Sequence, residues 1–523
     1  MENNRELPVG IQDFEKLRRG GCLYVDKTGY IYQLTRSEKP YFLGRPRRFG
    51  KSLLITTLKA YFLGKKELFE GLAVEALEKE WTAYPVFHID FNGANYGGDG
   101  MSALRSHLNS LLHDFEAKWQ CPVQEGSDLS ARFRNLIQYT CEHTGLKVVV
   151  LIDEYDKPLL ETMDNPQRSE EFRTFFKGFY GVIKGSDAYL RFVMLTGVTK
   201  FSQVSIFSDL NQLVDISMDE EYAGICGISE TELLQHFEPE IRTLAKKQKM
   251  SYKATLAELK KRYDGYHFAM NSEGMYNPFS LLNTFNSQAF RDYWFKTGTP
   301  TFLVKMLKNA DFDIRKLEND ITISARSVTD YRADNSNPIP VLYQSGYLTI
   351  KGYRPQYEAY TLGFPNGEVE YAFLSELLPL YVPSPVVCQD FWVGTFIDEL
   401  LAGEVDSFMG RLRALFADIP YDLNDTTEKH YHYGFYLIFK LMGQFVLSEV
   451  HSARGRADAV VVAGSTVYVF ECKITEQASA VDALRQISDR GYHLPYATDG
   501  RKVVKVGAEF SAEERTIKRW LVG

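Results

Sequence analysis

Two short segments of this sequence carry the residue types that bind phosphate and divalent metal ions. The first, Gly50-Lys51-Ser52, follows an apolar run and opens a helical pattern. Backbone N–H groups at a helix N-terminus bind phosphate oxygens, a lysine neutralises the β- and γ-phosphates, and a serine hydroxyl binds Mg²⁺. The spacing predicts that Gly50 and Lys51 contact phosphate and that Ser52 is a metal ligand. Arg45 stands where such loops usually have their first glycine, so a basic loop that only caps the helix is the alternative.

A strand that ends in acids supplies the second half of this site. Residues 148–152 are all apolar, and Asp153 and Glu154 follow directly. At the end of such a strand one carboxylate can enter the Mg²⁺ shell and the next can activate water, and we assign these roles to Asp153 and Glu154. An acidic loop after a core strand would look the same in isolation, but the two elements in this order indicate a site for ATP. Thr196, at the end of a later strand, could sense the γ-phosphate or simply end the strand.

A second set of charged residues lies near the C-terminus, in two β-rich runs separated by Gly464-Ser465. A two-residue loop with glycine first is typical of a type II′ hairpin, and the loop fixes the register of the two strands. In that register Val460 faces Val469, and Asp458 faces Glu471. The sequence therefore predicts two directly opposed carboxylates on one face of a hairpin.

The predicted pair of carboxylates suggests a metal site. Directly opposed residues have Cβ atoms about 4.5–5.5 Å apart, and like charges at that distance repel. A divalent cation between them reverses the sign of the interaction, so we predict that Asp458 and Glu471 bind Mg²⁺, with Mn²⁺ as the other candidate. Lys473 shares the face of Glu471 because side chains alternate along a strand, and it could activate water or stabilise charge on a phosphate. The alternative is a solvated hairpin with incidental charges.

The pattern Asp458, Glu471-x-Lys473 resembles the PD-(D/E)XK nuclease superfamily. The resemblance implies a restriction-endonuclease-like α/β domain in which Glu428, ahead of an apolar helix at 435–442, and Gln486 complete the catalytic set. Glu428 could equally be a favourable negative charge at the start of that helix. Basic residues near the hairpin could meet the phosphates of a nucleic acid. They are Arg454, Arg456, Lys473, Arg485 and Arg490.

The N-terminal part, over about residues 5–215, resembles the AAA-ATPase-like family, whose bacterial members typically carry a nuclease-like C-terminal domain. The resemblance rests on the segments Leu7-Pro8-Val9-Gly10, Tyr24-Val25-Asp26-Lys27-Thr28 and Arg45-Pro46-Arg47-Arg48-Phe49-Gly50-Lys51-Ser52. It implies a P-loop that dispenses with the usual first glycine. It also implies that Asp26 and Lys27 lie beside the nucleotide. Arg48, like Arg47, is read as positive charge near the phosphates.

These residues need elements to position them. Short apolar strands at 41–43, 86–91, 148–152 and 192–196 alternate with helical patterns, which predicts a P-loop α/β fold with a parallel sheet. Residues from about 220 to 310 read as helical, and a hairpin between 346 and 362 suits a winged-helix-like module. The last ~100 residues read as one helix, two strands and one helix. The predicted domains are a P-loop domain at 1–215, a helical extension at 216–330, a winged-helix-like or linker region at 331–415 and a nuclease-like domain at 416–523.

Composition bounds the class of protein. The chain has 523 residues, of which 45% are hydrophobic and 24% are charged, which excludes wholesale disorder. The formal net charge of −8 excludes a global positive field for coating nucleic acid. No apolar run approaches the roughly 18–20 residues that cross a bilayer, and the six cysteines show no metal-binding or disulfide spacing. We therefore expect a cytoplasmic protein that does not contact membranes.

The leading hypothesis is an ATP-binding and ATP-hydrolysing protein whose C-terminal domain cleaves phosphodiester bonds with Mg²⁺, in DNA rather than RNA, under the control of ATP. A homo-oligomer is expected because ATPases of this broad class often take an arginine from a neighbouring subunit. The alternative, from another class, is a nucleotide-gated binding or signalling switch in which the nuclease-like domain only recognises a partner.

Overall fold

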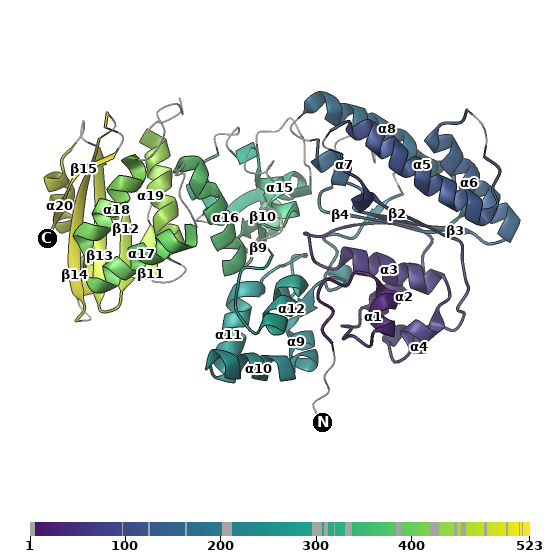
Figure 1. Ribbon diagram of the computed structural model, residues 1–523, viewed down its shortest axis with the longest axis horizontal. Helices are drawn as coiled ribbons and strands as arrows, with labels where there is room; N and C mark the ends of the chain where they lie inside the picture. The colour runs from purple at the N-terminus through teal and green to yellow at the C-terminus, as the bar shows by residue number, and fades with distance from the viewer. Residues whose placement is uncertain are drawn as a thin grey trace. The chain divides into compact units, whose positions relative to one another are not determined.

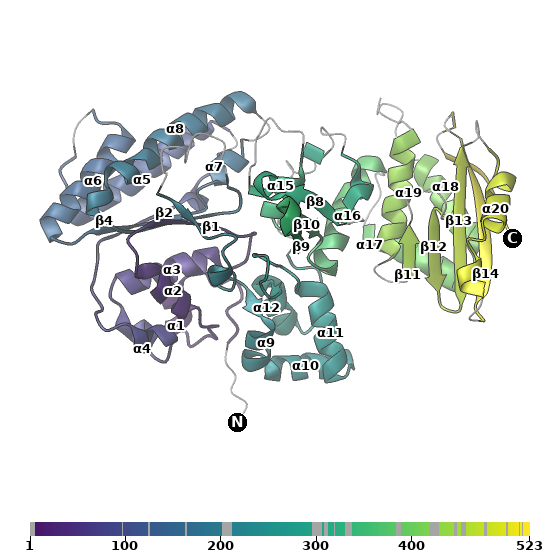
Figure 2. The ribbon, with the colours of Figure 1, turned by 180° about the vertical axis from the view of Figure 1, so that it is seen from behind.

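The computed structural model of the chain describes residues 6–96, 98–123, 126–162, 165–200, 212–294, 306–307, 312–317, 320–329, 337–382, 389–417, 428–443, 447–450, 457–474, 478–497, 500–511, 513–514 and 516–523. The chain divides into two compact units (Figures 1 and 2), here named the N-terminal and C-terminal units. They are Met1–Phe312 with Asp320–Glu368, and Asp313–Asn319 with Val369–Gly523. The finer division into four domains stays a prediction. Across the described ranges, no helix has the length and apolar character needed to cross a bilayer.

A parallel sheet forms the centre of the N-terminal unit, with its five strands in the order β2-β3-β4-β1-β5. The strands are β1 (Pro40–Gly44), β2 (Val86–Asp90), β3 (Val148–Asp153), β4 (Leu190–Gly197) and β5 (Val214–Asp215). The first four occupy the predicted positions. Every residue of β3 is buried, as expected of a strand covered on both faces. This sheet confirms the predicted α/β class.

Helices cover both faces of this sheet (Figure 1). On one face lies the helix that follows the phosphate-loop motif, and on the other lies a layer of three longer helices. The bounds are α3 (Lys51–Phe62), and α5 (Gly100–Trp119), α6 (Leu129–Thr144) and α8 (Pro166–Gly185). The helix α3 packs on β3, so the residues at its start are held close to the ends of the central strands.

The strand order determines where the polar residues meet. Because β4 lies between β1 and β3 and pairs in parallel with both, the carboxyl ends of these three strands share one edge of the sheet. There Gly44 pairs with Gly197, and Asp153 stands beside Asp90 of β2. Binding sites in open parallel sheets lie at this edge. The loop after β1 and the acids after β3 are therefore brought together, as predicted.

The rest of the N-terminal unit is helical and then mixed, and its assignment to a helical extension and a winged-helix-like region stays a prediction. Four helices, α9 (Glu230–His236), α10 (Glu238–Gln248), α11 (Tyr252–Tyr263) and α12 (Pro278–Ser287), pack around an apolar cluster. Next along the chain come β8 (Ile321–Ser324), α14 (Ala325–Thr329), α15 (Ile339–Gln344), β9 (Thr349–Arg354) and β10 (Ala359–Gly363). These strands form an antiparallel sheet in the order β8-β10-β9.

The C-terminal unit is an α/β layer structure. Its sheet has the order β11-β12-β13-β14-β15, and only β13 and β14 pair in parallel. The strands are β11 (Leu447–Val450), β12 (Ala459–Ala463), β13 (Thr466–Ile474), β14 (Lys502–Ser511) and β15 (Thr516–Val522). Figure 2 shows α20 (Ala480–Asp489) on one face and α17 (Gln389–Ala402), α18 (Val405–Ala417) and α19 (Glu428–Met442) on the other. The predicted hairpin β12–β13 lies at the centre, but the sheet has three strands that were not predicted.

Candidate nucleotide and metal sites

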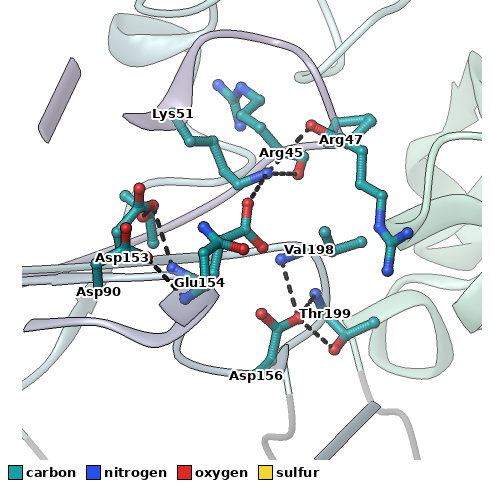
Figure 3. A network of polar contacts seen from close by, with 12 residues as sticks. Arg45, Arg47, Lys51, Asp90, Asp153, Glu154, Asp156, Val198 and Thr199 are labelled. Carbon is teal, nitrogen blue, oxygen red and sulfur yellow. Dashed lines mark hydrogen bonds and ion pairs between the residues drawn. The ribbon is translucent and has the colours of Figure 1, made fainter. Parts of the chain in front are cut away.

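The loop after β1 forms the first candidate site. Gly50, with φ of +93°, ends the loop and precedes α3. The left-handed backbone favours glycine there, and crowding does not, since an added Cβ would meet no described atom within 4 Å. The Lys51 side chain is buried, and its Nζ donates to the carbonyls of Arg45 at 3.1 Å and Pro46 at 3.3 Å. The same Nζ lies 3.2 Å from Glu154 Oε1 (Figure 3).

The predicted metal and water-activating residues lie next to this lysine. Asp153 is buried, and its Oδ1 accepts a hydrogen bond from the Thr196 hydroxyl at 2.6 Å. Glu154 has φ of +51°, a strained backbone angle for a residue other than glycine. Its carboxylate points toward Lys51 (Figure 3). Ser52 follows in the first turn of α3 and is half-buried. Lys51, Asp153, Glu154 and Thr196 therefore form one cluster, in which Thr196 orients the Asp153 carboxylate.

Asp156 belongs to this network but was assigned no role from the sequence. Its carboxylate is completely buried, and Oδ2 accepts from the backbone N–H groups of Val198 and Thr199 at 2.9 and 2.6 Å and from the Thr199 hydroxyl at 2.8 Å. It thus ties the end of β3 to the end of β4 (Figure 3). Burial, together with the charge of Glu154, raises the pKa of Asp156 to about 6. The sequence signal that could have identified Asp156 is its position in the acid-rich segment from Asp153 to Asp156.

Arg45 explains why the loop lacks its usual first glycine. The guanidinium is buried and donates to the carbonyls of Ser217 at 2.7 Å and Tyr222 at 3.0 Å. It also lies over the Phe268 ring, 4.1 Å from the centroid. Arg45 is therefore a structural residue that fixes the start of the loop to later segments of the unit.

Arg48 has a different environment. Its φ is +67°, and its guanidinium lies 3.8 Å from the centroid of the Phe279 ring. Burial lowers the pKa of this guanidinium, and the neighbouring charge of Arg47 acts in the same direction. The contact of Arg48 with phosphate stays a prediction.

Asp26 and Lys27, expected beside the nucleotide, connect the helix that begins at Thr28 with the helix that begins at Ala73 and with α9. Lys27 Nζ lies 2.8 Å from Glu232 Oε2, on α9. Asp26 accepts from the Thr28 hydroxyl at 2.6 Å and from the Ala73 N–H at 2.7 Å. These contacts are structural, and Lys27 also lines a cavity next to the phosphate loop, so a place beside the nucleotide stays a prediction.

That cavity begins at Gly50 and is partly open to solvent. Its walls are mainly apolar side chains from the N-terminal segment, the phosphate loop and the region before α9. They include Leu23, Val25, Phe49, Leu54, Ile225 and Ile228. A flat, largely apolar group could enter it while a phosphate attached to that group reached the start of α3.

The hairpin in the C-terminal unit forms the second candidate site, and its predicted register is confirmed. Val460 is opposite Val469, and Gly464 in the turn has φ of +60°. Asp458 and Glu471 lie one position beyond the last paired residues of the ladder. Asp458 Oδ2 accepts from the backbone N–H that follows Glu471 in the chain, at 2.8 Å. The two carboxylates thus lie at the same end of the hairpin.

Glu471 is the most unusual acid of this site. Its side chain is 2% exposed, and Oε1 accepts from Lys473 Nζ at 2.8 Å and from Gln486 Nε2. Its Oε2 is buried and has no hydrogen-bond partner among the described residues. Burial and the charge of Asp458 raise the pKa of Glu471 to about 7, and burial also raises the pKa of Asp458. A divalent cation would supply the missing partner and offset the repulsion, so these residues fit a metal ion.

The remaining predicted residues of this site are placed as follows. Gln486, on α20, contacts Glu471 and lies 3.3 Å from the Tyr492 hydroxyl. Glu428 is the first residue of α19, and its side chain lies outside the described part of the chain. Asp458, Glu471, Lys473 and Gln486 are brought together. Among the described residues, no three or more His, Cys, Asp or Glu side chains are grouped so that they could hold a metal ion together. A place for Glu428 beside Asp458 and Glu471 in the metal site stays a prediction.

Among solved structures, Cdc6p from Pyrobaculum aerophilum aligns over 63% of this chain and 84% of its own with 10% identity and a TM-score of 0.21. The ORC2 protein of Aeropyrum pernix, solved as ADPNP–ADP complexes, aligns over 78% of this chain and 97% of its own with 12% identity and a TM-score of 0.21. Alignments this weak say nothing about the function of this chain.

Two family models match the chain. A predicted AAA-ATPase model matches residues 8–207, and a PD-(D/E)XK nuclease superfamily model matches residues 426–520. A relative from Azotobacter chroococcum mcd 1, named as an uncharacterized protein in the vnfD 5′ region, is 38% identical over 538 residues, covering 99% of each chain. The chain therefore belongs to the family of AAA-ATPase-like proteins that end in a PD-(D/E)XK nuclease superfamily domain.

Proposed function

We propose that the protein binds and hydrolyses ATP in its N-terminal unit and cleaves phosphodiester bonds of DNA, with Mg²⁺, in its C-terminal unit. One observation made in both units carries the proposal. In each, a lysine ammonium lies close to a carboxylate at the end of buried strands, at 3.2 Å for Lys51 and Glu154 and at 2.8 Å for Lys473 and Glu471. Hydrolysis of the phosphoanhydride of ATP and of phosphodiesters can use a positive charge beside an acid that binds metal or accepts a proton.

In the N-terminal unit the Lys51 ammonium exchanges its contact with Glu154 for the charge of the β- and γ-phosphates. This exchange leaves the Glu154 carboxylate free to accept a proton from the attacking water. Ser52 and Asp153 would hold Mg²⁺, which when bound neutralises charge on the phosphates. Thr196 and Asp156 keep the ends of β3 and β4 in place. The cavity beside Gly50 is the proposed site of the purine base.

In the C-terminal unit Asp458 and Glu471 would hold Mg²⁺, with Mn²⁺ as a substitute, and the bound metal would polarise the scissile phosphate. Lys473 places its ammonium beside this centre, where it can orient water and stabilise negative charge on the phosphate. Gln486 holds Glu471 in position. DNA is proposed over RNA on the family relationship, and ATP is proposed to regulate the cleavage.

Cleavage of linear and circular DNA with Mg²⁺ tests the C-terminal assignment. Asp458→Ala, Glu471→Ala and Lys473→Ala should each reduce the rate at least ~100-fold, which is the scale of losing a catalytic group. Asp489→Ala is the matched control, since Asp489 is an exposed acid on α20, and it should leave cleavage unchanged. Cleavage at the wild-type rate by all four variants would refute the assignment. Nucleotide binding without cleavage or turnover would support a binding switch instead.

Assembly into a homo-oligomer belongs to the same proposal, because an arginine from a neighbouring subunit can complete sites of this kind. Light scattering with and without ATP and Mg²⁺ tests it. A mass that stays at that of one chain under both conditions would contradict it.

A further inference from the structure

The phosphate loop is held in shape by residues far away in the sequence. Phe49 packs edge-on against Tyr266 and Phe268, with ring centroids 4.7 and 5.2 Å apart. Pro46 lies against Gly346, where an added Cβ would come within 2.6 Å of the proline ring. The loop therefore depends for its shape on the later segments of the N-terminal unit.

Trp294 contacts the main chain of the loop directly. Its Nε1 donates to the Arg47 carbonyl at 3.1 Å, and its ring meets the Tyr347 ring edge-on at 5.2 Å. In a trans peptide the carbonyl and the following N–H point in opposite directions. Because the Arg47 carbonyl points toward Trp294, the Arg48 N–H points away from Trp294.

The backbone of Arg48 needs such support. Its φ of +67° is costly for a residue with a side chain and persists only where the surroundings impose it. Left-handed residues at Arg48 and Gly50, with φ of +67° and +93°, flank Phe49. Alternating conformations of this kind turn successive N–H groups into a concave anion site. The hydrogen bond from Trp294 is one of the contacts that impose this shape.

Glu368 in turn fixes Trp294. The carboxylate is 2% exposed, and it accepts from the backbone N–H groups of Tyr293 and Trp294, the latter at 2.8 Å. It also accepts from the Ser280 hydroxyl at 2.7 Å, on α12. Glu368 is the second residue of α16 (Gly367–Tyr381), the helix whose remaining residues belong to the C-terminal unit. A chain of contacts thus runs from the phosphate loop to the start of this helix.

We propose that Trp294 and Glu368 are positioning residues for nucleotide binding, through which the phosphate loop and the start of α16 are coupled. Glu368 orients Trp294, and Trp294 holds the Arg47 carbonyl so that the loop presents its N–H groups to phosphate. Nucleotide in the site stabilises this arrangement, and the arrangement favours nucleotide by the same factor. The inference rests on the proposed ATP site and adds a route by which nucleotide acts on the segment leading to the nuclease domain.

The test is the Kd of ADP and of a non-hydrolysable ATP analogue for the full chain with Mg²⁺. Trp294→Phe keeps a ring in place but removes the donor, and it should weaken both nucleotides about tenfold, the scale of one lost hydrogen bond. Trp119→Phe is the matched control, because the buried Nε1 of Trp119 has no hydrogen-bond partner in the described part of the chain. The Kd of this variant for either nucleotide should equal that of the wild type. Glu368→Gln should also weaken the binding of both nucleotides.

Two readouts separate positioning from a general structural role. The double variant of Trp294→Phe and Glu368→Gln should be less impaired than the product of the single effects, since both act on one hydrogen-bonded chain. In the wild-type protein, nucleotide should slow hydrogen exchange at the backbone amides of Tyr293 and Trp294. The exchange experiment needs no variant, so it decides the question even if a substitution disturbs folding.

The outcomes also distinguish this inference from the proposed function. Suppose that the wild-type chain binds nucleotide but that Trp294→Phe binds it equally well, or that nucleotide does not change the exchange rate at these amides. Either result refutes the coupling and leaves the proposed ATP site unaffected. If the wild-type chain binds no nucleotide, both are refuted.

Discussion

The Lys51–Glu154 ion pair at 3.2 Å joins two residues with opposite tasks. In the proposed function, Lys51 binds the phosphates of ATP and Glu154 accepts a proton from the attacking water. We expect Glu154→Gln to bind ATP at least as tightly as the wild type, because Lys51 loses a competing partner, and to hydrolyse it at least ~100-fold more slowly, because the proton acceptor is gone. Nucleotide titration and phosphate release measure the two effects.

The exposed pair of Lys147 and Glu38, 2.7 Å apart, offers a control for this prediction. Glu38→Gln removes a similar pair from the surface of the same unit, and neither binding nor turnover should change. Turnover of Glu154→Gln at the wild-type rate would contradict the assigned role.

Glu368 gives the N-terminal unit a predictable dependence on pH. Burial raises its pKa to about 7, against about 4.3 for an exposed glutamate. The stability linked to this raised pKa is fully present below about pH 4.3 and is lost as the pH rises through about 7. Glu368→Gln should therefore flatten the decline of the urea midpoint of this unit between about pH 4.3 and about pH 7. A decline as steep as that of the wild type would contradict the raised pKa.

Residues that act through local spacing could be predicted, and residues that act through distant contacts could not. Lys51 lies at a fixed position after Gly50, and Glu471 faces Asp458 because of a two-residue turn. Trp294 has no such local signal, because its partner carbonyl at Arg47 is 247 positions away. Nothing in the neighbourhood of Glu368 indicated that its partners would be two backbone N–H groups more than 70 positions earlier.

Packing between α20 and the sheet of the C-terminal unit gives a prediction at the level of elements. Gly507, in β14, lies so close to α20 that an added Cβ would come within 2.5 Å of the Ala480 carbonyl and 2.6 Å of the Leu484 N–H. Gly507→Ala should push the helix outward, destabilise this unit by about 1–3 kcal/mol and move Gln486 away from Glu471, so that cleavage also falls. Urea denaturation and the cleavage rate measure this.

Gly394 provides the matched substitution, because it lies in α17 of the same unit and an added Cβ would meet nothing within 4 Å. Gly394→Ala should be neutral or stabilising, since alanine favours the helix by up to ~1 kcal/mol over glycine. If the two alanine variants had the same stability, close packing at Gly507 would be refuted.

The same unit shows which elements sequence can predict. The hairpin β12–β13 has unbroken β-rich runs and a glycine turn, so both its strands and its register could be derived. The pairing of β14 with β13 is parallel and crosses over through α20, so no local turn announces it. In β14, Lys502 and Lys505 are three residues apart, which breaks the polar–apolar alternation typical of a strand, and Gly507 weakens the pattern further. The predicted plan of one helix, two strands and one helix therefore missed this strand.

For the whole molecule, the net charge of −8 and the local sites agree. Neither site relies on a broad positive surface, since each concentrates one lysine and two acids at strand ends. Binding of DNA should therefore be weak without metal and should depend mainly on the centre at Asp458 and Glu471. Two chemistries in separate compact units should also be separable by substitution.

Measuring ATP hydrolysis and Mg²⁺-dependent DNA cleavage on the same preparations of wild type, Lys51→Ala and Asp458→Ala, each with and without ATP, tests the central claim most directly. The account predicts both activities in the wild type, loss of ATP turnover and of the ATP effect on cleavage in Lys51→Ala, and loss of cleavage with ATP turnover retained in Asp458→Ala. Cleavage that persists unchanged in Asp458→Ala, or ATP turnover that persists unchanged in Lys51→Ala, would contradict it.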